Sequence, residues 1–174
     1  MDDTRTSCEA HVPDLQRFLT RPVGSLVLAP TALAAILGEG WARWPNETGG
    51  VLLGRRLNGA EHSVVVHQAI GPGPSARNDR GGFEPDTEWQ AAQVATAWAA
   101  NMTLEYLGDW HTHPGGTTGF SELDRATART IATAPEARQP RPVMLVAVLQ
   151  QDLSSRMAAA VLLDGRLRPL RTHL

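Results

Sequence analysis

The sequence contains few of the features that mark secreted or membrane-embedded proteins. Cys8 is the only cysteine among the 174 residues, which excludes an intrachain disulfide and a zinc site built from cysteines. No apolar run approaches the roughly 20 residues that span a bilayer. The acidic and polar start, MDDTRTSCEA, is not typical of a signal peptide. We therefore expect a cytoplasmic protein without membrane contact.

The sequence also lacks a large excess of either positive or negative charge. The net charge is −2, so no broad basic field is available and we expect no nucleic-acid partner. At 42% hydrophobic and 20% charged residues the composition is that of an ordinary globular protein. A chain of 174 residues is long enough for one domain with its own core. We expect that domain over residues 23–174, preceded by an N-terminal arm over residues 1–22.

One stretch, Gly108–Asp124, organises the rest of the chain, and it reads GDWHTHPGGTTGFSELD. The apolar run that leads into it, residues 103–110, predicts a buried strand. Side chains alternate between the faces of a strand, so His111 and His113 share one face and both imidazoles point the same way. A glycine-rich turn follows, and it allows Asp124 to return to the two histidines.

Each part of this stretch also has a simpler interpretation. A His-x-His pair occurs on many partly buried strands without a metal, and Ser121-x-x-Asp124 is also the pattern of a helix capping box. Capping and metal binding are compatible, because the cap determines where Asp124 points. The combination favours a metal site, since two imidazoles and one carboxylate form a three-ligand zinc set whose fourth position is left to water.

Helical and extended segments alternate along the chain. Periodicity and turn residues predict a first strand over 25–29 and helices over 31–44, 87–101 and 123–133, with further strands over 51–57, 61–70, 143–149, 157–163 and 167–170. Asn58-Gly59 predicts a two-residue hairpin turn. The continuous apolar run 143–149 is typical of a central strand buried on both faces. This order predicts an α/β sandwich around a mixed sheet.

The motif HTHPGGTTGFSELD resembles the signature of the JAMM metalloproteases, also called MPN+ or JAB. That family places a glutamate well upstream, and here Glu47 precedes Thr48-Gly49-Gly50 and an apolar strand. The wider pattern is similar to the short bacterial JAB proteins found beside ubiquitin-like conjugation enzymes, in integrative elements and in antiphage operons. The similarity in architecture covers roughly residues 25–170.

The resemblance implies a three-layer α/β/α sandwich and one zinc ion per chain, held by His111, His113 and Asp124. It implies Glu47 as general base and Ser121 as a donor to the developing oxyanion. The expected substrate is the C-terminal tail of a ubiquitin-like protein or its conjugate, with E1/E2-like enzymes of the same operon as further partners.

Other functions remain open at this stage. The same chemistry suits a peptidase that processes a sulfur-carrier protein or a short peptide. A non-catalytic binding module on the same fold is a second alternative, although such members usually lack one of the five residues. The third is a structural zinc site in which Glu47 is the fourth ligand.

Several further residues have predicted roles near the cleft. The Gly/Pro-rich segment Gly71–Pro85 is expected to be a loop that flanks the active cleft, anchored by Phe83. Asn78 is a candidate for holding substrate. Gly115 and Gly116 would let an extended tail approach closely. Asp109 either orients a histidine or lies in solvent.

Overall fold

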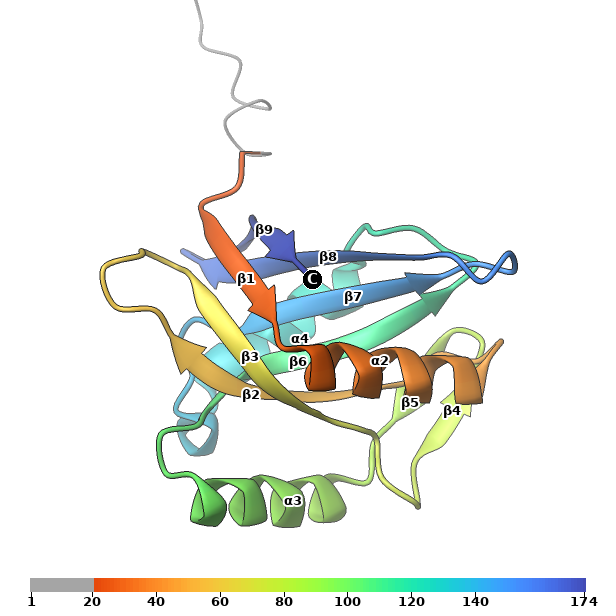
Figure 1. The fold of residues 1–174 in the computed structure, drawn as a ribbon, viewed down its shortest axis with the longest axis horizontal. Coiled ribbons are helices and arrows are strands. Elements are labelled where there is room, and N and C mark those ends of the chain that lie inside the picture. Colours follow the sequence, from red (N-terminus) through yellow and green to blue (C-terminus); the bar gives the residue numbers. More distant parts are fainter. Residues whose placement is uncertain (1–20) are drawn as a thin grey trace, which may run out of the picture.

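The computed structural model describes residues 21–174. Seven strands form one sheet in the order β1-β3-β2-β6-β7-β8-β9, and β4 pairs with β5 in a separate hairpin (Figure 1). The strands are Gly24–Leu28 (β1), Gly49–Arg56 (β2), Val64–Ile70 (β3), Arg77–Asp79 (β4), Gly82–Glu84 (β5), Glu105–Pro114 (β6), Val143–Leu149 (β7), Ser155–Leu163 (β8) and Arg166–His173 (β9). The predicted arm, residues 1–22, lies outside the described residues apart from Arg21 and Pro22.

The main sheet closes on itself because β1 pairs with strands from both ends of the sheet. It lies parallel to β3 on one side and parallel to β9 on the other. The pair β6–β7 is also parallel, whereas β2–β3, β2–β6, β7–β8 and β8–β9 are antiparallel. The prediction of an α/β fold with a mixed sheet is confirmed. The three-layer sandwich is not confirmed: the seven strands form a closed, barrel-like sheet, because β1 pairs with both β3 and β9.

Helices pack against this sheet from different sides (Figure 1). They are α2 (Pro30–Arg43), α3 (Thr87–Ala100), α4 (Glu122–Thr133) and a short 3-10 helix over Pro135–Ala137. Pro30 occupies the first turn of α2, where its fixed φ and missing N–H cost nothing. Ile36 of α2 is fully buried in the main core, whereas Ala128 of α4 packs with Met144 and Leu162 in a second cluster.

The central strand β7 separates these two clusters. All seven of its residues are buried, which confirms the prediction of a strand covered on both faces. Val143, Leu145 and Ala147 belong to the main core, and Met144 faces the α4 cluster. Each fully buried aliphatic side chain contributes roughly 1.5–3 kcal/mol relative to exposure, so β7 is a rigid base for the neighbouring strand β6.

Strand β6 contains a bulge that changes which side chains share a face. Its pairing with β2 skips one residue, since Leu52 lies opposite Gly108 and Leu53 lies opposite Tyr106. Gly108 has a φ of +142°, and a Cβ there would lie 2.0 Å from the carbonyl oxygen of Val143. Only glycine fits this position. The bulge places Tyr106 on the same face as the side chains that follow Gly108 at odd positions.

Two connections differ from their predictions. The two-residue turn expected at Asn58-Gly59 is wrong, because β2 ends at Arg56 and β3 begins only at Val64. The Leu57 N–H donates to the Ser63 carbonyl over 2.9 Å and closes a wider loop. The predicted loop Gly71–Pro85 contains the short β4–β5 hairpin, which lies beside the ends of β2 and α2 (Figure 1).

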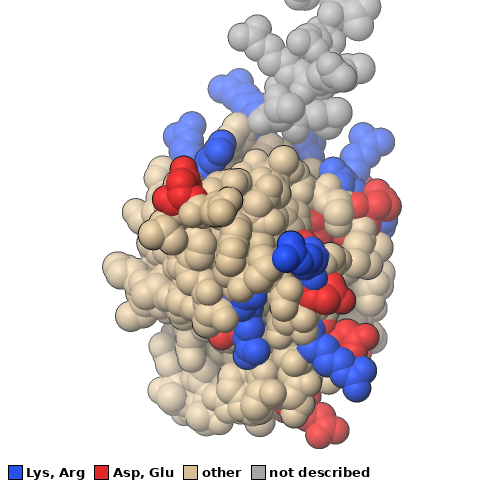
Figure 2. All heavy atoms as spheres, turned by 90° about the vertical axis from the view of Figure 1, so that its right-hand side faces the viewer, with Lys and Arg blue, Asp and Glu red and all other residues tan. Residues whose placement is uncertain are grey.

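The surface carries charges of both signs. On the face shown in Figure 2, arginines and acidic residues are interspersed around a broad uncharged area.

Among the described residues, no helix is both long enough and apolar enough to cross a membrane.

Candidate metal centre

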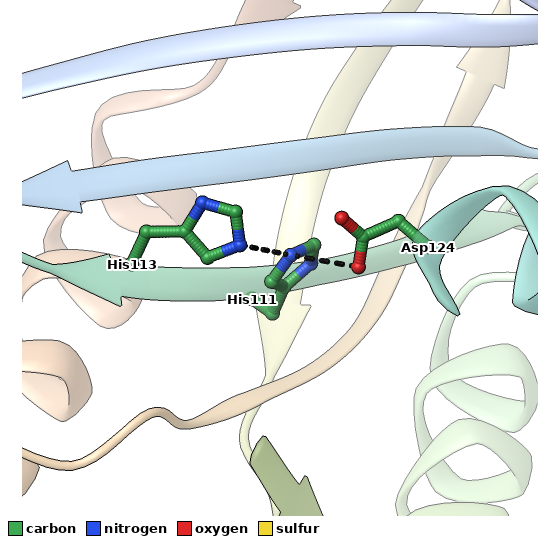
Figure 3. Close-up of side chains that lie close together, drawn as sticks. All are labelled: His111, His113 and Asp124. Carbon is green, nitrogen blue, oxygen red and sulfur yellow. Dashed lines mark hydrogen bonds and ion pairs between the residues drawn. The ribbon is translucent and has the colours of Figure 1, made fainter. Parts of the chain in front are cut away.

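Strand β6 presents two imidazoles to the same side of the sheet. His111 lies opposite Val146 of β7 and His113 lies opposite Val148, so the two histidines are two positions apart on a regular ladder. Thr112 between them points to the opposite face and is fully buried. The predicted alternation is therefore confirmed, and both Nε2 atoms point toward the start of α4 (Figure 3).

Helix α4 brings the third side chain of the cluster. Ser121 is its N-cap, and the Asp124 N–H donates to Ser121 Oγ over 3.1 Å. In return the Ser121 N–H donates to Asp124 Oδ2 over 2.6 Å, which completes a capping box. The other carboxylate oxygen, Oδ1, lies 3.2 Å from His111 Nε2. One oxygen of Asp124 thus serves the helix and the other faces the histidines.

The three donor atoms have the spacing that a tetrahedral metal requires. The Nε2 atoms of His111 and His113 lie 3.0 Å apart, and the three ligand atoms, including one from Asp124, all lie within 4.8 Å of one another. Ligands about 2.0–2.1 Å from a tetrahedral zinc are roughly 3.3 Å apart. The donor set therefore fits a divalent cation with nitrogen and oxygen ligands.

The protonation of Asp124 suits a ligand. Burial acts to raise its pKa, but the interaction with His111 and the N–H of Ser121 outweigh burial and lower the pKa to about 2. The carboxylate is therefore ionised throughout the neutral range, which is the form that binds metal.

The glycine-rich turn orients the second histidine. His113 Nδ1 lies 2.8 Å from the carbonyl oxygen of Thr117, and a carbonyl can only accept. Nδ1 therefore carries the proton and Nε2 has its lone pair free for a metal. Gly115, with a φ of +67°, allows the chain to turn back sharply enough for this contact.

Glu47 lies in the same cavity as His111 and Asp124. The β4–β5 hairpin holds its backbone from both sides: the Glu47 N–H donates to the Asp79 carbonyl over 2.7 Å, and Asn78 Nδ2 donates to the Glu47 carbonyl over 2.9 Å. Burial raises the pKa of the Glu47 carboxyl, and the charges of His113 and His111 oppose that effect. A partly desolvated carboxylate is suited to act as a base.

Phe83 anchors the hairpin over the strand that follows Glu47. A Cβ at Gly49 would lie 2.3 Å from Cζ of Phe83 and 2.4 Å from the carbonyl oxygen of Trp110. Glycine at this position therefore allows the phenylalanine ring to lie directly on the backbone of β2. The expected anchoring role of Phe83 agrees with this contact.

The residues predicted to bind substrate lie in two places. Asn78 and Phe83 belong to the hairpin, and Phe83 lines the cavity that contains Glu47. The side-chain nitrogen of Asn78 is already bonded to Glu47. Gly115 and Gly116 lie in the turn after His113, where the carbonyl of Gly116 accepts a hydrogen bond from Gln150. No substrate contact of these residues is shown, and that role stays a prediction.

Sequence reasoning did not identify the partner of Asp109. The hydroxyl of Tyr106 donates to Asp109 Oδ1 over 2.7 Å, so neither expected role, orienting a histidine or lying free in solvent, describes its main contact. Burial raises the pKa of Asp109 to about 6, against the opposing effects of Tyr106 and His111. Burial and Asp109 also raise the pKa of Tyr106, so its hydroxyl remains a donor.

Comparison with known proteins places the chain in a family. A family model described as "Prokaryotic homologs of the JAB domain" matches residues 30–159, which include both histidines, Glu47, Ser121 and Asp124. The chain belongs to this prokaryotic JAB family, as its motif predicted.

The names of three relatives support a hydrolase of the JAB type with a metal ion. "Probable metalloprotease y4qB" of Sinorhizobium fredii (strain NBRC 101917 / NGR234) is 35% identical over 124 residues, covering 70% of this chain and 74% of that protein. A "CD-NTase/cGAS isopeptidase" of Enterobacter hormaechei subsp. hoffmannii is 25% identical over 122 residues, or 70% of this chain and 66% of that protein. A protein of the same name from Pseudomonas aeruginosa is 32% identical over 103 residues, or 59% and 62%.

A solved structure shares the fold. The solution structure of protein DSY2949 from Desulfitobacterium hafniense matches with a TM-score of 0.65 at 18% identity, over 85% of this chain and 91% of that one. At this identity the likeness concerns the fold alone.

Proposed function

We propose that this protein is a zinc-dependent peptidase or isopeptidase that cleaves the bond after the C-terminal tail of a ubiquitin-like protein or its conjugate. The observation that carries the proposal is the convergence of His111, His113 and Asp124 in one cluster, with Glu47 in the adjoining cavity. Three protein ligands leave one tetrahedral position open, which is the arrangement of catalytic zinc sites.

A zinc ion bound there would lower the pKa of a coordinated water toward about 7 and polarise the scissile carbonyl. Glu47 takes the proton of the attacking water while the new C–O bond forms. It then delivers that proton to the amine nitrogen as the C–N bond breaks. Two hydrogen bonds from the hairpin fix the Glu47 backbone, and so help to position the carboxylate for both transfers.

Ser121 supplies a donor for the oxygen that gains negative charge. Its Oγ accepts from the Asp124 N–H, so its own O–H proton remains available, and the residue is exposed at the start of α4. A donor in such a position typically contributes about 10²–10³ in rate. Capping therefore uses the hydroxyl oxygen as an acceptor, and catalysis uses the hydroxyl proton as a donor.

The substrate class rests on the relatives. Two of them carry the name "CD-NTase/cGAS isopeptidase", which supports a conjugate as the substrate of this chain. Our proposal places the protein in the cytoplasm, beside E1/E2-like enzymes of an antiphage system. An extended tail bound along the backbone of a strand would gain its affinity from main-chain hydrogen bonds.

The test combines zinc content with cleavage of ubiquitin-like fusions and conjugates. We expect one zinc per chain in the native protein and in Glu47→Gln, and cleavage by the native protein alone. Glu84→Gln is the matched control, because Glu84 is an exposed carboxylate of the same hairpin, and it should cleave normally. Loss of zinc in Glu47→Gln would identify Glu47 as a ligand and overturn the proposed mechanism. A zinc-bound native protein that leaves every conjugate intact and cleaves a sulfur-carrier fusion instead would overturn the substrate class.

A further inference from the structure

A cavity of about 300 Å³ extends from the metal cluster between α4 and the β4–β5 hairpin. Its walls are largely apolar and are formed by Phe83, Pro85, Leu123 and Met144. Leu123 is 70% exposed, so its side chain is accessible to a ligand that enters this cavity. Asp109 also lines this cavity, next to the apolar side chains.

The bulge in β6 is responsible for the position of the Asp109 carboxylate. Asp109 is two residues before His111 and shares its face of the sheet. Because the pairing skips a residue at Gly108, Tyr106 lies on this face as well, and its hydroxyl bonds one oxygen of Asp109. The Tyr106 carbonyl in turn accepts from the buried side chain of Gln139. Hydrogen bonds therefore tie both the Tyr106 backbone and one oxygen of Asp109 in place.

Asp109 takes part in no ion pair among residues 21–174. Its carboxylate accepts a hydrogen bond from the Tyr106 hydroxyl, and His111 interacts with it electrostatically. Its function is also unassigned, because the metal is held by other residues and the base is Glu47. A half-buried carboxylate that opens into an apolar cavity attracts a group that combines an apolar stem with a positive end.

We propose that this cavity binds a basic side chain, arginine or lysine, of the substrate segment next to the scissile bond. The apolar stem lies between Phe83 and Leu123, and the cationic end meets Asp109. Tyr106 is the positioning residue, because it orients the carboxylate without touching the substrate. This inference rests on the proposed function and adds a side-chain preference to it.

Binding tests the inference without any need for cleavage. The probes are fluorescent six-residue peptides of glycine and alanine that carry either arginine or its neutral analogue citrulline at each of the six positions in turn. Polarisation is measured with the zinc-bound full chain carrying Glu47→Gln. We expect arginine to bind about 10- to 100-fold more tightly than citrulline at one position, as a hydrogen bond to a charged group allows.

Variants separate the charge from the rest of the cavity. Asp109→Asn should abolish the preference for arginine while changing citrulline binding less than twofold, and Tyr106→Phe should reduce the preference in part. Leu123→Ala, an exposed substitution that leaves the core intact, should weaken both peptides equally. Glu122→Gln, which changes an exposed carboxylate on the same turn of α4, should alter neither.

Each outcome decides between the two claims. Equal binding of arginine and citrulline at every position, binding of no peptide at millimolar concentration, or equal losses of both peptides in Asp109→Asn would overturn the inference. A native enzyme that cleaves no conjugate but still prefers arginine through Asp109 would retain the inference and remove the proposed function. Cleavage without any such preference would do the reverse.

Discussion

Replacing Asp109 by asparagine should stabilise the metal-free protein at neutral pH. Burial raises the pKa of this carboxyl from 3.8 to about 6, which means that the folded protein holds its proton more tightly than the unfolded chain does. Ionisation of Asp109 therefore opposes folding. Asparagine keeps the size of the side chain and an oxygen that accepts from the Tyr106 hydroxyl, but it has no charge to desolvate.

The sign and size of the effect follow from the two pKa values. Below about pH 4 the carboxyl is protonated in both states and the penalty is absent. The penalty grows as the pH rises through the window between the two values and is complete above about pH 6. A difference of about two units corresponds to about 3 kcal/mol. Because Asp109 is exposed in part to the cavity, we expect Asp109→Asn to gain about 1–3 kcal/mol above pH 6.

Urea or thermal unfolding in the presence of a chelator measures this gain at pH 4, 5, 6 and 7.5. For a domain of this size, each kcal/mol shifts the melting temperature by about 2–4 °C. The same substitution at Asp164, an exposed residue of the β8–β9 turn, is the control for exchanging a carboxylate for an amide and should not reproduce the gain. An Asp109→Asn difference that is flat with pH, or a variant less stable at pH 7.5, would refute the burial argument.

Three further substitutions test how the site is held. Asn78→Ala removes the hydrogen bond to the Glu47 carbonyl and should lower kcat about tenfold or more at unchanged zinc content; a change in KM alone would instead favour a role in holding substrate. Gly108→Ala places a Cβ 2.0 Å from the Val143 carbonyl at a positive φ, so we expect a loss of roughly 4 kcal/mol or more in denaturant unfolding; a well-folded variant would contradict the bulge. Ser121→Asn keeps an N-cap and so the stability within a few tenths of a kcal/mol, but should reduce kcat by about 10²–10³ because the hydroxyl donor is lost; an unchanged kcat would restrict Ser121 to capping.

The metal cluster was predictable because it depends on local rules. Two-residue alternation on β6 and the capping box of α4 each act within a few positions, so the sequence already determined where His111, His113 and Asp124 point. Glu47 is different. Glu47 is distant in sequence from the metal ligands, and no local pattern around it indicates a metal site. It was identified through the resemblance to a family pattern.

The closed sheet and the Asp109–Tyr106 pair were not predictable from periodicity. Closure depends on β1 pairing with β9, and contacts between the two ends of a chain leave no periodic pattern. The Asp109 contact depends on the bulge, which shifts the alternation by one residue and so misleads a simple count along β6. Gly108 is the one sequence signal for it, since an isolated glycine in a strand often marks a bulge.

The carboxylate of Asp124 links two equilibria that are usually separate. Because one oxygen closes the first turn of α4 and the other faces the histidines, fraying of that turn and release of the ion are coupled in free energy. Metal occupancy is therefore expected to slow amide hydrogen exchange in the first turn of α4. By the same reciprocity, any partner that stabilises the first turn of α4 also raises the affinity for the ion, even if that partner never enters the cavity.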